Sequence, residues 1–361
     1  MMRCLELFAG AGGAALGLER AGFHHAALCE WDANACATLR AAGLGPVVEG
    51  DVRDLDAIES FLRLSESDAW RIAGDRLLDS ELNGDDWTLE RERVALEMID
   101  RSTSPDLLWS SWPCQPWSSA GKRLGAEDDR NGWPWTVDAI DRFRPRWLLA
   151  ENVRGLLNHS EDGHPDSQKC PRCYFENVIL VQLRERFGHV GWWLLDAADY
   201  GVPQHRRRVI IWAGPAPLRA PRPTHGAPSK ARQGDMFGRV VLPWVSMGAA
   251  LDLGSERKGS GPWIGDRPSP TVSTVEVFGS TDKYRSPGDR PKMNRASDAL
   301  WADTGRRQLT IAECATLQAF PDDHPWQGNA RSRYRQVGNA VPPPLAEVVG
   351  LALINAGRGQ P

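Results

Sequence analysis

Arg3-Cys4-Leu5-Glu6-Leu7-Phe8-Ala9-Gly10-Ala11-Gly12-Gly13 is the stretch that decides the fold of this chain of 361 residues. Its first half is mostly apolar and predicts a buried strand, and its second half is a glycine-rich turn that leads into an apolar helix over 14–21. Glycines in such a turn let the backbone approach a ligand, and the start of a helix favours negative charge. The stretch therefore predicts the first strand, turn and helix of an α/β domain with a ligand site at the turn.

The alternation of strand and helix patterns continues along the chain. Further strands are expected over 26–30, 47–51, 107–110, 147–150, 192–195 and 209–212, and further helices over 33–42, 178–187, 309–320 and 345–355. This order predicts a doubly wound, mostly parallel sheet of Rossmann-like α/β type. Residues 56–104 are expected to form a helical insertion at the sheet edge, which is acidic because 51–100 hold 15 Asp and Glu against 6 Lys and Arg.

Charge is divided unevenly between the two halves of the chain. Residues 1–201 hold 21 Lys and Arg against 34 Asp and Glu, whereas residues 202–361 hold 22 against 13, and 18 of those 22 cations are arginines. Arginine suits bidentate contacts with phosphates and bases, so the basic half predicts a nucleic-acid partner. From Gly214 to about Arg306 helix signals fade and Pro, Gly and Arg increase, which predicts a second, irregular domain.

Cysteine usage and hydropathy limit the cellular setting. Seven cysteines form no regular framework, which predicts a reducing intracellular compartment. We find no sufficiently long apolar run in the sequence for a membrane span. The apolar run over 5–18 contains Glu6 and several glycines, so it is better explained by the strand and turn than by a secretory leader.

Acidic residues follow three of the predicted strands. Glu30 can accept the ribose hydroxyls of a nucleoside cofactor, Trp31 can stack on a purine, and Asp51 can accept an exocyclic amine. Glu151 ends another apolar strand. For each acid the alternative is simple capping of the following helix.

A cysteine between two prolines follows the strand over 107–110. Pro113-Cys114-Gln115-Pro116 would present the sulfur at the carboxyl end of that strand, where ligands bind in open α/β sheets. Because the carboxyl ends of parallel strands meet at one edge, Cys114 and Glu151 are expected to share a pocket. An inert buried cysteine is the alternative.

Seven short motifs stand in a fixed order between Leu5 and Gly350. They are Phe8-x-Gly10-x-Gly12, Glu30-Trp31-Asp32, Gly50-Asp51, Pro113-Cys114-Gln115, Glu151-Asn152-Val153, Gln204-x-Arg206-x-Arg208 and Gly338-Asn339-Ala340-Val341. In this order they resemble the motifs of the bacterial-type DNA cytosine-5 methyltransferases. Each motif alone is weak, but the ordered set is specific.

The resemblance implies transfer of a methyl group from S-adenosylmethionine to C5 of cytosine in a specific double-stranded DNA sequence, through a flipped-out base and a covalent adduct with C6. The catalytic residues it implies are Cys114, Glu151, Arg206 and Arg208. The cofactor residues are Phe8, Gly10, Gly12, Glu30, Trp31, Asp51, Pro113 and Asn339. The DNA contacts are Gln115, Ser118, Lys122, Arg123, Gln204 and Thr271.

The resemblance also implies a domain organisation and a setting. The S-adenosylmethionine-binding catalytic domain would cover 1–213 plus 307–361, and a target-recognition domain would cover 214–306, where Arg267-Pro268-Ser269-Pro270-Thr271-Val272 resembles the family pattern. We expect a monomer without membrane contact, in the cytoplasm of a bacterial cell or phage-infected host. It would be associated with the nucleoid through DNA. A cognate restriction endonuclease could act separately beside it.

The chemistry requires no metal, but one pattern lies outside the family motifs. Cys170-x-x-Cys173, with His159 and His164 upstream, leaves a structural zinc open against a loop with two reduced thiols.

Three other functions stay open at this point. The first is a tRNA cytosine-5 methyltransferase of the same fold, which would not need a long segment for reading a DNA sequence. A catalytically inactive DNA-binding homologue would not need Cys114, Glu151 and Arg208. A dinucleotide-dependent oxidoreductase leaves the cysteine and arginine motifs unexplained.

Overall fold

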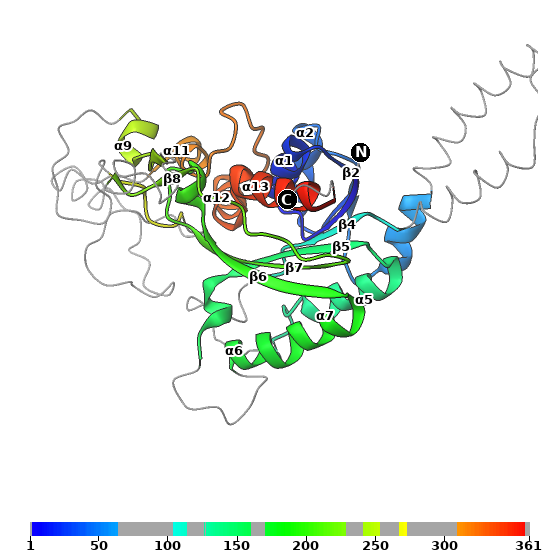
Figure 1. Cartoon of the computed structure of the whole chain (residues 1–361). Helices are drawn as coiled ribbons and strands as arrows, with labels where there is room; N and C mark the ends of the chain where they lie inside the picture. The colour runs from blue at the N-terminus through cyan, green and yellow to red at the C-terminus, as the bar shows by residue number, and fades with distance from the viewer. Residues whose placement is uncertain are drawn as a thin grey trace, which may run out of the picture.

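A seven-stranded sheet forms the centre of the molecule (Figure 1). The structure, a computed structural model, describes residues 2–63, 104–113, 126, 128–159, 170–228, 241–252, 267–272 and 309–357. Within these residues the strand order is β3-β2-β1-β4-β5-β7-β6. The strands are β1 (Met2–Leu7), β2 (Phe23–Glu30), β3 (Val47–Glu49), β4 (Leu107–Ser110), β5 (Trp147–Val153), β6 (His189–Asp196) and β7 (Arg207–Gly214).

Most neighbouring strands in this sheet are parallel. The run from β3 through β2, β1 and β4 to β5 is parallel throughout, whereas β7 pairs antiparallel with both β5 and β6. The predicted mostly parallel sheet is therefore confirmed. The antiparallel edge brings the carboxyl end of β5 beside the amino end of β7.

Helices cover both faces of the sheet, as a doubly wound fold requires (Figure 1). One face carries α1 (Gly13–Ala21), α2 (Ala33–Ala41) and α13 (Pro343–Gly357), and the other carries α5 (Trp133–Phe143) and α7 (Leu180–Arg186). A Cβ on Gly17 would lie 2.3 Å from the carbonyl oxygen of Pro343, so the close packing of α1 on α13 requires glycine there. On the other face, Leu5 and Leu7 of β1 share a core with Ile140 and Leu183.

The opening stretch of sequence folds as predicted. β1 is followed by a turn in which Gly12 has a φ of +87° and forms the N-cap of α1. A Cβ at Gly12 would lie 2.4 Å from the side chain of Leu44, so both the left-handed backbone and the space favour glycine. The strand, turn and helix are thus fixed by local sequence.

Several elements differ from the sequence prediction. The helix expected over 178–187 begins earlier, as α6 (Pro171–Tyr174) followed by a π-helical turn, η3 (Phe175–Ile179), and α7. β3 ends at Glu49, so Asp51 lies in the following turn. A further helix, α12 (Ala330–Asn339), lies between the helices expected over 309–320 and 345–355, and it includes Gly338 and Asn339 of the last motif. Asn329 caps α12 by accepting a hydrogen bond from the backbone N–H of Ser332 at 2.9 Å, which compensates for a mostly polar sequence.

The region between 214 and 306 is described only in part. It contains a short parallel pair, β8 (His225–Gly226) and β9 (Leu242–Pro243), and one helical turn, α9 (Met247–Ala250). α11 (Ile311–Leu317) follows it and begins with a capping box between Thr310 and Glu313. Residues 55–63 are helical, and the rest of the acidic insertion lies outside the described residues. The domain boundaries therefore stay predictions.

One stretch of the described residues could cross a membrane by length and composition alone. It is Ala330–Gly357, which spans α12 and α13, and 61% of its most apolar window is buried inside the protein. Leu345, Val349 and Leu353 of α13 are fully buried against the sheet and α1. The packing identifies a core helix and explains the apolar composition.

Candidate active site

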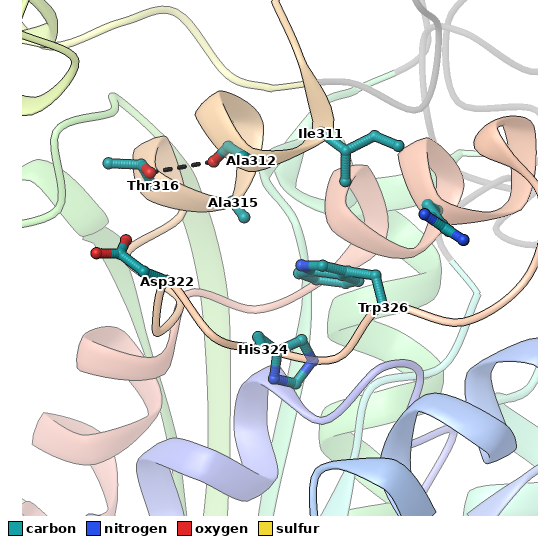
Figure 2. Close-up of a pocket in the computed structure, with 8 residues that line it drawn as sticks. Ile311, Ala312, Ala315, Thr316, Asp322, His324 and Trp326 are labelled. Atoms are coloured by element: carbon teal, nitrogen blue, oxygen red, sulfur yellow. Dashed lines mark hydrogen bonds between the residues drawn. The ribbon is translucent and has the colours of Figure 1, made fainter.

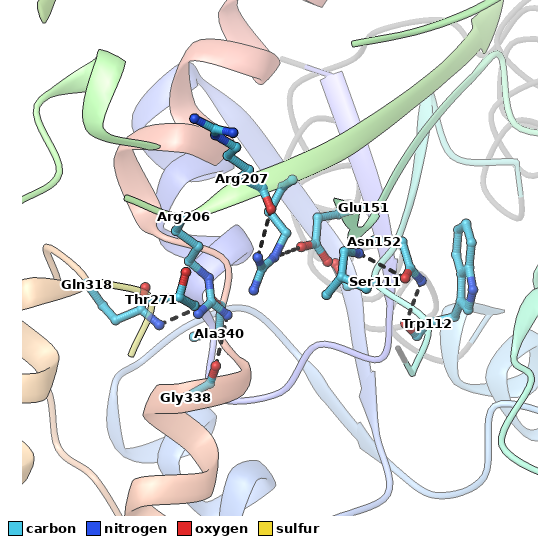
Figure 3. Close-up of polar contacts among 12 residues, drawn as sticks. Ser111, Trp112, Glu151, Asn152, Arg206, Arg207, Thr271, Gln318, Gly338 and Ala340 are labelled. Atoms are coloured by element: carbon cyan, nitrogen blue, oxygen red, sulfur yellow. Dashed lines mark hydrogen bonds and ion pairs between the residues drawn. The ribbon is translucent and has the colours of Figure 1, made fainter. Parts of the chain in front are cut away.

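A glutamate and an arginine meet at the boundary between the parallel and antiparallel parts of the sheet (Figure 3). Glu151 of β5 is opposite Ile210 of β7, and Val153 is opposite Arg208, so Glu151 and Arg208 are diagonal neighbours on one face. The Nε atom of Arg208 lies 2.6 Å from Oε1 of Glu151, and both residues are buried. The strand register therefore creates a buried ion pair from residues that are far apart in sequence.

The pKa of the Glu151 carboxyl is raised above its usual range. Burial is the main cause, and the neighbouring Arg208 and Arg206 guanidinium groups act in the opposite direction. Arg208 also donates from Nη1 to the carbonyl oxygen of Arg207 at 2.9 Å, which fixes the orientation of its guanidinium (Figure 3). A carboxyl in this setting can hold or share a proton nearer to neutral pH than an exposed glutamate can.

The residue after Glu151 ties β5 to the chain that precedes Cys114. Asn152 donates from Nδ2 to the carbonyl oxygen of Trp112 at 3.2 Å, and its Oδ1 accepts from the backbone N–H of Val153 at 2.9 Å (Figure 3). Trp112 also packs on Trp133, with ring centroids 5.2 Å apart. The backbone position directly before Pro113 is thus anchored to the strand that carries Glu151.

Part of the predicted site lies outside the described residues. Pro113 is the last described residue before this gap, and it follows the anchored carbonyl of Trp112. The residues concerned are Cys114, Gln115, Ser118, Lys122 and Arg123.

Two residues of the arginine motif, Gln204 and Arg206, are buried. Gln204 is fully buried, donates from Nε2 to the carbonyl oxygen of Leu317 at 3.0 Å, and accepts from the N–H of Val272 at 2.9 Å. Arg206 is 1% exposed and donates to the carbonyl oxygens of Val272 at 3.0 Å and Gly338 at 2.8 Å (Figure 3). Gln204 and Arg206 thus hold backbone atoms of distant segments, while the DNA contact predicted for Gln204 and the catalytic role predicted for Arg206 stay predictions.

Thr271 remains on the surface beside these buried contacts. Its hydroxyl donates to the carbonyl oxygen of His205 at 2.8 Å, and the residue is exposed. The side chain lies next to Arg206 (Figure 3). Arg206 and Gln204 both hold the backbone of Val272, and we call this pair of contacts the clasp. Thr271 is thus positioned by the clasp while facing solvent.

The glycine-rich turn forms a second polar centre, around Glu30 at the end of β2. One carboxylate oxygen of Glu30 accepts from the N–H of Gly10 at 2.8 Å, and the other accepts from Trp31 at 3.0 Å and Asp32 at 2.9 Å. Burial raises the pKa of Glu30, and these three backbone N–H groups oppose the rise. Asp32 caps α2, so the capping role that the sequence left open for the acids belongs to Asp32 here.

The surroundings of Glu30 suit a nucleoside. Gly10 has a φ of +57°, and a Cβ there would meet nothing within 4 Å, so the turn borders open space. The Trp31 side chain is 76% exposed and free to stack on a planar ring. Phe8 stacks on Trp135 at 6.4 Å between centroids. The turn, the carboxylate and the aromatic groups therefore fit a nucleoside-containing cofactor.

Asp51 and Asn339 flank this centre differently. Asp51 accepts from the backbone N–H and Nε of Arg53 at 2.9 and 2.8 Å, and this contact lowers the pKa of Asp51. Asp51 is therefore an acceptor at neutral pH. Asn339 is the exposed last residue of α12.

A separate cavity of about 470 Å³ lies between α11, the 322–326 loop and α12 (Figure 2). None of the predicted site residues lines it. His324 in its wall lies with Nε2 3.1 Å from the carbonyl oxygen of Ala11, and burial lowers the pKa of His324 to about 4. The neutral ring must donate to that carbonyl, because a carbonyl oxygen only accepts. His324 in the cavity wall thus stabilises the glycine-rich turn through its hydrogen bond to Ala11.

Sequence reasoning missed two supporting residues. Asn152 lies inside a quoted motif, but its side chain was given no role, and only the pairing of β4 with β5 reveals its contact with Trp112. Gln318 is fully buried and donates from Nε2 to the carbonyl oxygen of Val337 at 2.7 Å. Nothing in the sequence around Gln318 signals this contact, which joins α11 to α12.

The cysteine pair outside the family motifs is also located. His159, Cys170 and Cys173 come together, whereas His164 lies outside the described residues.

Comparisons with known proteins identify the family of this chain. The sequence profile of the C-5 cytosine-specific DNA methylases matches residues 2–69, 78–233 and 260–355. The chain is 31% identical to the type II methyltransferase M.NgoMIV of Neisseria gonorrhoeae, over 98% of this chain and 97% of that protein. It is 32% identical to the type II methyltransferase M.NaeI of Lentzea aerocolonigenes, over 97% of this chain and 74% of that protein.

A solved structure shows the same fold. The Dnmt2 methyltransferase of S. pombe superposes with a TM-score of 0.55 and 16% sequence identity, over 99% of each chain. At this identity the likeness concerns the fold alone.

Proposed function

This chain belongs to the C-5 cytosine-specific DNA methylases, and we propose that it methylates one specific double-stranded DNA sequence through a flipped-out cytosine and a covalent cysteine adduct. Its activity is that of a DNA cytosine-5-methyltransferase of the restriction-modification type. The observation that carries the proposal is the buried pair of Glu151 and Arg208, on a strand tied through Asn152 to the chain before Cys114.

Cys114 is the proposed nucleophile. C5 of cytosine is a poor nucleophile, so a thiolate first bonds to C6 and shifts an electron pair towards C5. After C5 has gained the methyl group, the proton on C5 leaves, the C6–S bond breaks, and the sulfur departs as thiolate. The base must leave the stack because C5 and C6 are inaccessible inside a duplex.

Glu151 is the proposed partner of N3 and the N4 amino group. A protonated carboxyl donates to N3 while its carbonyl oxygen accepts from N4, which offsets the charge that develops on the ring. The raised pKa of Glu151 supports this role, because burial favours the protonated form. Arg208, held against Glu151, is proposed to bind O2 of the pyrimidine and keep the ring in line with Cys114.

S-adenosylmethionine is the proposed cosubstrate, and it supplies an electrophilic methyl group. Glu30 is proposed to accept the ribose hydroxyls, Trp31 and Phe8 to contact the purine, and Asp51 to accept its amino group. Gly10 and Gly12 let the backbone come close, and Pro113 and Asn339 complete the proposed set. The open space at Gly10 and the exposed face of Trp31 support this assignment.

The region over 214–306 is proposed to read the DNA sequence, with the catalytic domain on 1–213 plus 307–361. The excess of basic residues in 202–361 supports a polyanionic partner. Gln115, Ser118, Lys122 and Arg123, beyond the described residues, and the exposed Thr271 are proposed DNA contacts. We further propose a monomer that acts on cytoplasmic DNA beside a separate restriction endonuclease.

Gln204 and Arg206 are proposed to position this recognition region. Both side chains hold the backbone of Val272, which follows the Arg267–Thr271 segment. Arg206 also holds Gly338, so one guanidinium joins Val272 to α12. This clasp would keep the recognition region in a fixed position relative to Arg208.

Covalent capture tests the proposed nucleophile. Wild-type protein incubated with S-adenosylmethionine and a duplex containing 5-fluorocytosine should form a stable adduct, because fluorine cannot leave as the C5 proton does. Cys114→Ser should form no adduct and no methylated product while binding S-adenosylmethionine as the wild type does. Cys314→Ala, a buried cysteine of α11, is the matched control and should still form the adduct.

Two outcomes would contradict the proposal. Turnover by Cys114→Ser would refute the nucleophile. Methylation of tRNA but not of duplex DNA would refute the substrate.

A further inference from the structure

Three potential metal ligands come together where the chain leaves β5 and enters α6. The ligand atoms of His159, Cys170 and Cys173 all lie within 4.8 Å of one another. Two of them belong to a Cys-x-x-Cys turn, and the third lies on a segment eleven residues upstream of Cys170. No step proposed for methylation uses these residues.

The distances fit a tetrahedral zinc site. With Zn–S near 2.3 Å and Zn–N near 2.0 Å, a sulfur and a nitrogen on one zinc ion lie about 3.6 Å apart. Sγ of Cys170 and Nδ1 of His159 are 3.8 Å apart. A shift of a few tenths of an ångström would therefore place both atoms at bonding distance from one ion.

The backbone already holds the two ligand segments together. The N–H of Arg172, between the two cysteines, donates to the carbonyl oxygen of Asn158 at 3.1 Å. Leu156 before His159 and Phe175 after Cys173 are fully buried in the core beneath α5 and α7. The ligands thus stand on two anchored segments, which reduces the loss of chain entropy when an ion binds.

We propose that His159, Cys170 and Cys173 bind one zinc ion in a structural site. Among the common biological cations, zinc is the one that two thiolates and an imidazole bind best. Cys170 is buried at the start of α6, Cys173 is partly buried and His159 is exposed, so an ion can enter from solution. The fourth position is left to solvent or to a further side chain, and His164 forms no part of the proposal.

The site would brace the residues that follow the predicted nucleophile. Tyr174, next to Cys173, accepts at its hydroxyl from Nδ2 of Asn131 at 3.0 Å, and the same Nδ2 lies 3.2 Å from the carbonyl oxygen of Ala126. Asn131 and Ala126 lie where the chain returns from the Cys114 segment. An ion on Cys173 would therefore stabilise Tyr174 and, through it, this return point.

Metal analysis tests the site directly. Full-length protein purified under reducing conditions without chelator should contain about one zinc ion per chain by mass spectrometry of the metal. Cys173→Ser and His159→Ala change accessible side chains and should lower the zinc content at least about tenfold. Cys314→Ala and the exposed His189→Ala are the matched controls and should retain the ion.

Cobalt substitution provides a second measurement, which does not require that zinc stays bound during purification. Chelator-treated protein reconstituted with Co²⁺ should show a thiolate-to-cobalt charge-transfer band, and Cys173→Ser should weaken it. Wild-type protein with no zinc and no such band would overturn the proposal. Zinc retained at full content in both Cys173→Ser and His159→Ala would overturn it equally.

Thermal unfolding separates a structural ion from an adventitious one. Chelation should lower the Tm of the wild type, and it should lower the Tm of His159→Ala by much less, because that variant has already lost the ion. An equal effect of chelator on both proteins would contradict the structural role. None of these measurements depends on methylation, so the zinc site and the proposed catalytic roles can fail separately.

Discussion

Glu30 and Glu151 are two buried glutamates at strand ends that the protein holds in different ways. Each is 7% exposed, and burial raises the pKa of each. Glu30 is held by three backbone N–H groups from its own turn and the glycine-rich turn. Glu151 is held by the side chain of Arg208, which reaches it from another strand.

The difference fits the proposed roles of Glu30 as a binding group and of Glu151 as a reacting group. Backbone N–H groups cannot lose their protons or move away, so they hold the Glu30 side chain in one orientation as an acceptor. A guanidinium partner can shift towards a ligand and leave the carboxyl free to exchange a proton. Two equally buried glutamates are thus proposed to serve for binding near the carboxyl end of β2 and for proton chemistry near that of β5, and substitutions can test this division.

The largest expected effect comes from Glu151→Gln. The amide keeps the shape and the ability to donate to N3, but it cannot give up a proton to the ring. We expect kcat to fall about 10²–10³-fold, with S-adenosylmethionine affinity unchanged. Single-turnover methylation and calorimetry measure the two quantities, and a loss of cofactor affinity would break the comparison.

Glu30→Gln should have the complementary effect. The amide nitrogen would replace one acceptor and leave a backbone N–H without its partner, so S-adenosylmethionine should bind about 10–100-fold more weakly. Methylation at saturating cofactor should change far less. Glu49→Gln is the matched control, since Glu49 also ends a strand but lies exposed beside Arg40. A lower kcat at saturation, with an unchanged Kd, would assign Glu30 to the chemistry.

A double-mutant cycle sharpens the contrast between the two partners. Glu151→Gln and Arg208→Lys should be coupled by about 1 kcal/mol or more, because each removes half of the same pair. Glu30→Gln and Arg208→Lys should be additive within about 0.5 kcal/mol. Both cycles can be measured on kcat/KM. Additivity in the first cycle would show that the ion pair does not act as a unit.

The smallest effect concerns pH and stability. A glutamate with a raised pKa binds more protons in the folded state than in the unfolded state, so its contribution to stability falls as pH rises above the usual glutamate pKa. Glu30→Gln and Glu151→Gln should therefore each reduce this fall. Chemical denaturation across pH 4–8 measures it, and an unchanged slope in both variants would contradict the raised pKa values.

The sequence predicted the features that depend on neighbouring residues. The first strand, glycine-rich turn and helix need only local patterns, and Glu30 follows its strand as expected. The apolar run over 147–150 predicted β5, but the strand continues through Glu151 to Val153. α12 was missed because its sequence is mostly polar and its stability comes from the cap at Asn329 and packing partners far along the chain.

Long-range contacts could not be predicted in the same way. Gln204 and Arg206 sit in a basic motif that suggests an exposed surface, yet both are buried. Their partners, Val272, Leu317 and Gly338, are 66 to 132 residues away along the chain. Only the folded arrangement shows which arginine of the motif faces Glu151 and which one faces backbone carbonyls.

The contacts of Gln204 and Arg206 have a consequence for changes of side chain in the proposed recognition region. At Val272 both side chains bind main-chain N–H and carbonyl groups, which every amino acid except proline offers alike. Side chains in the proposed recognition region can therefore be substituted while the two hydrogen bonds to the backbone of residue 272 are kept. The proposed recognition region could then be exchanged for one that reads another DNA sequence without a change in Gln204 or Arg206.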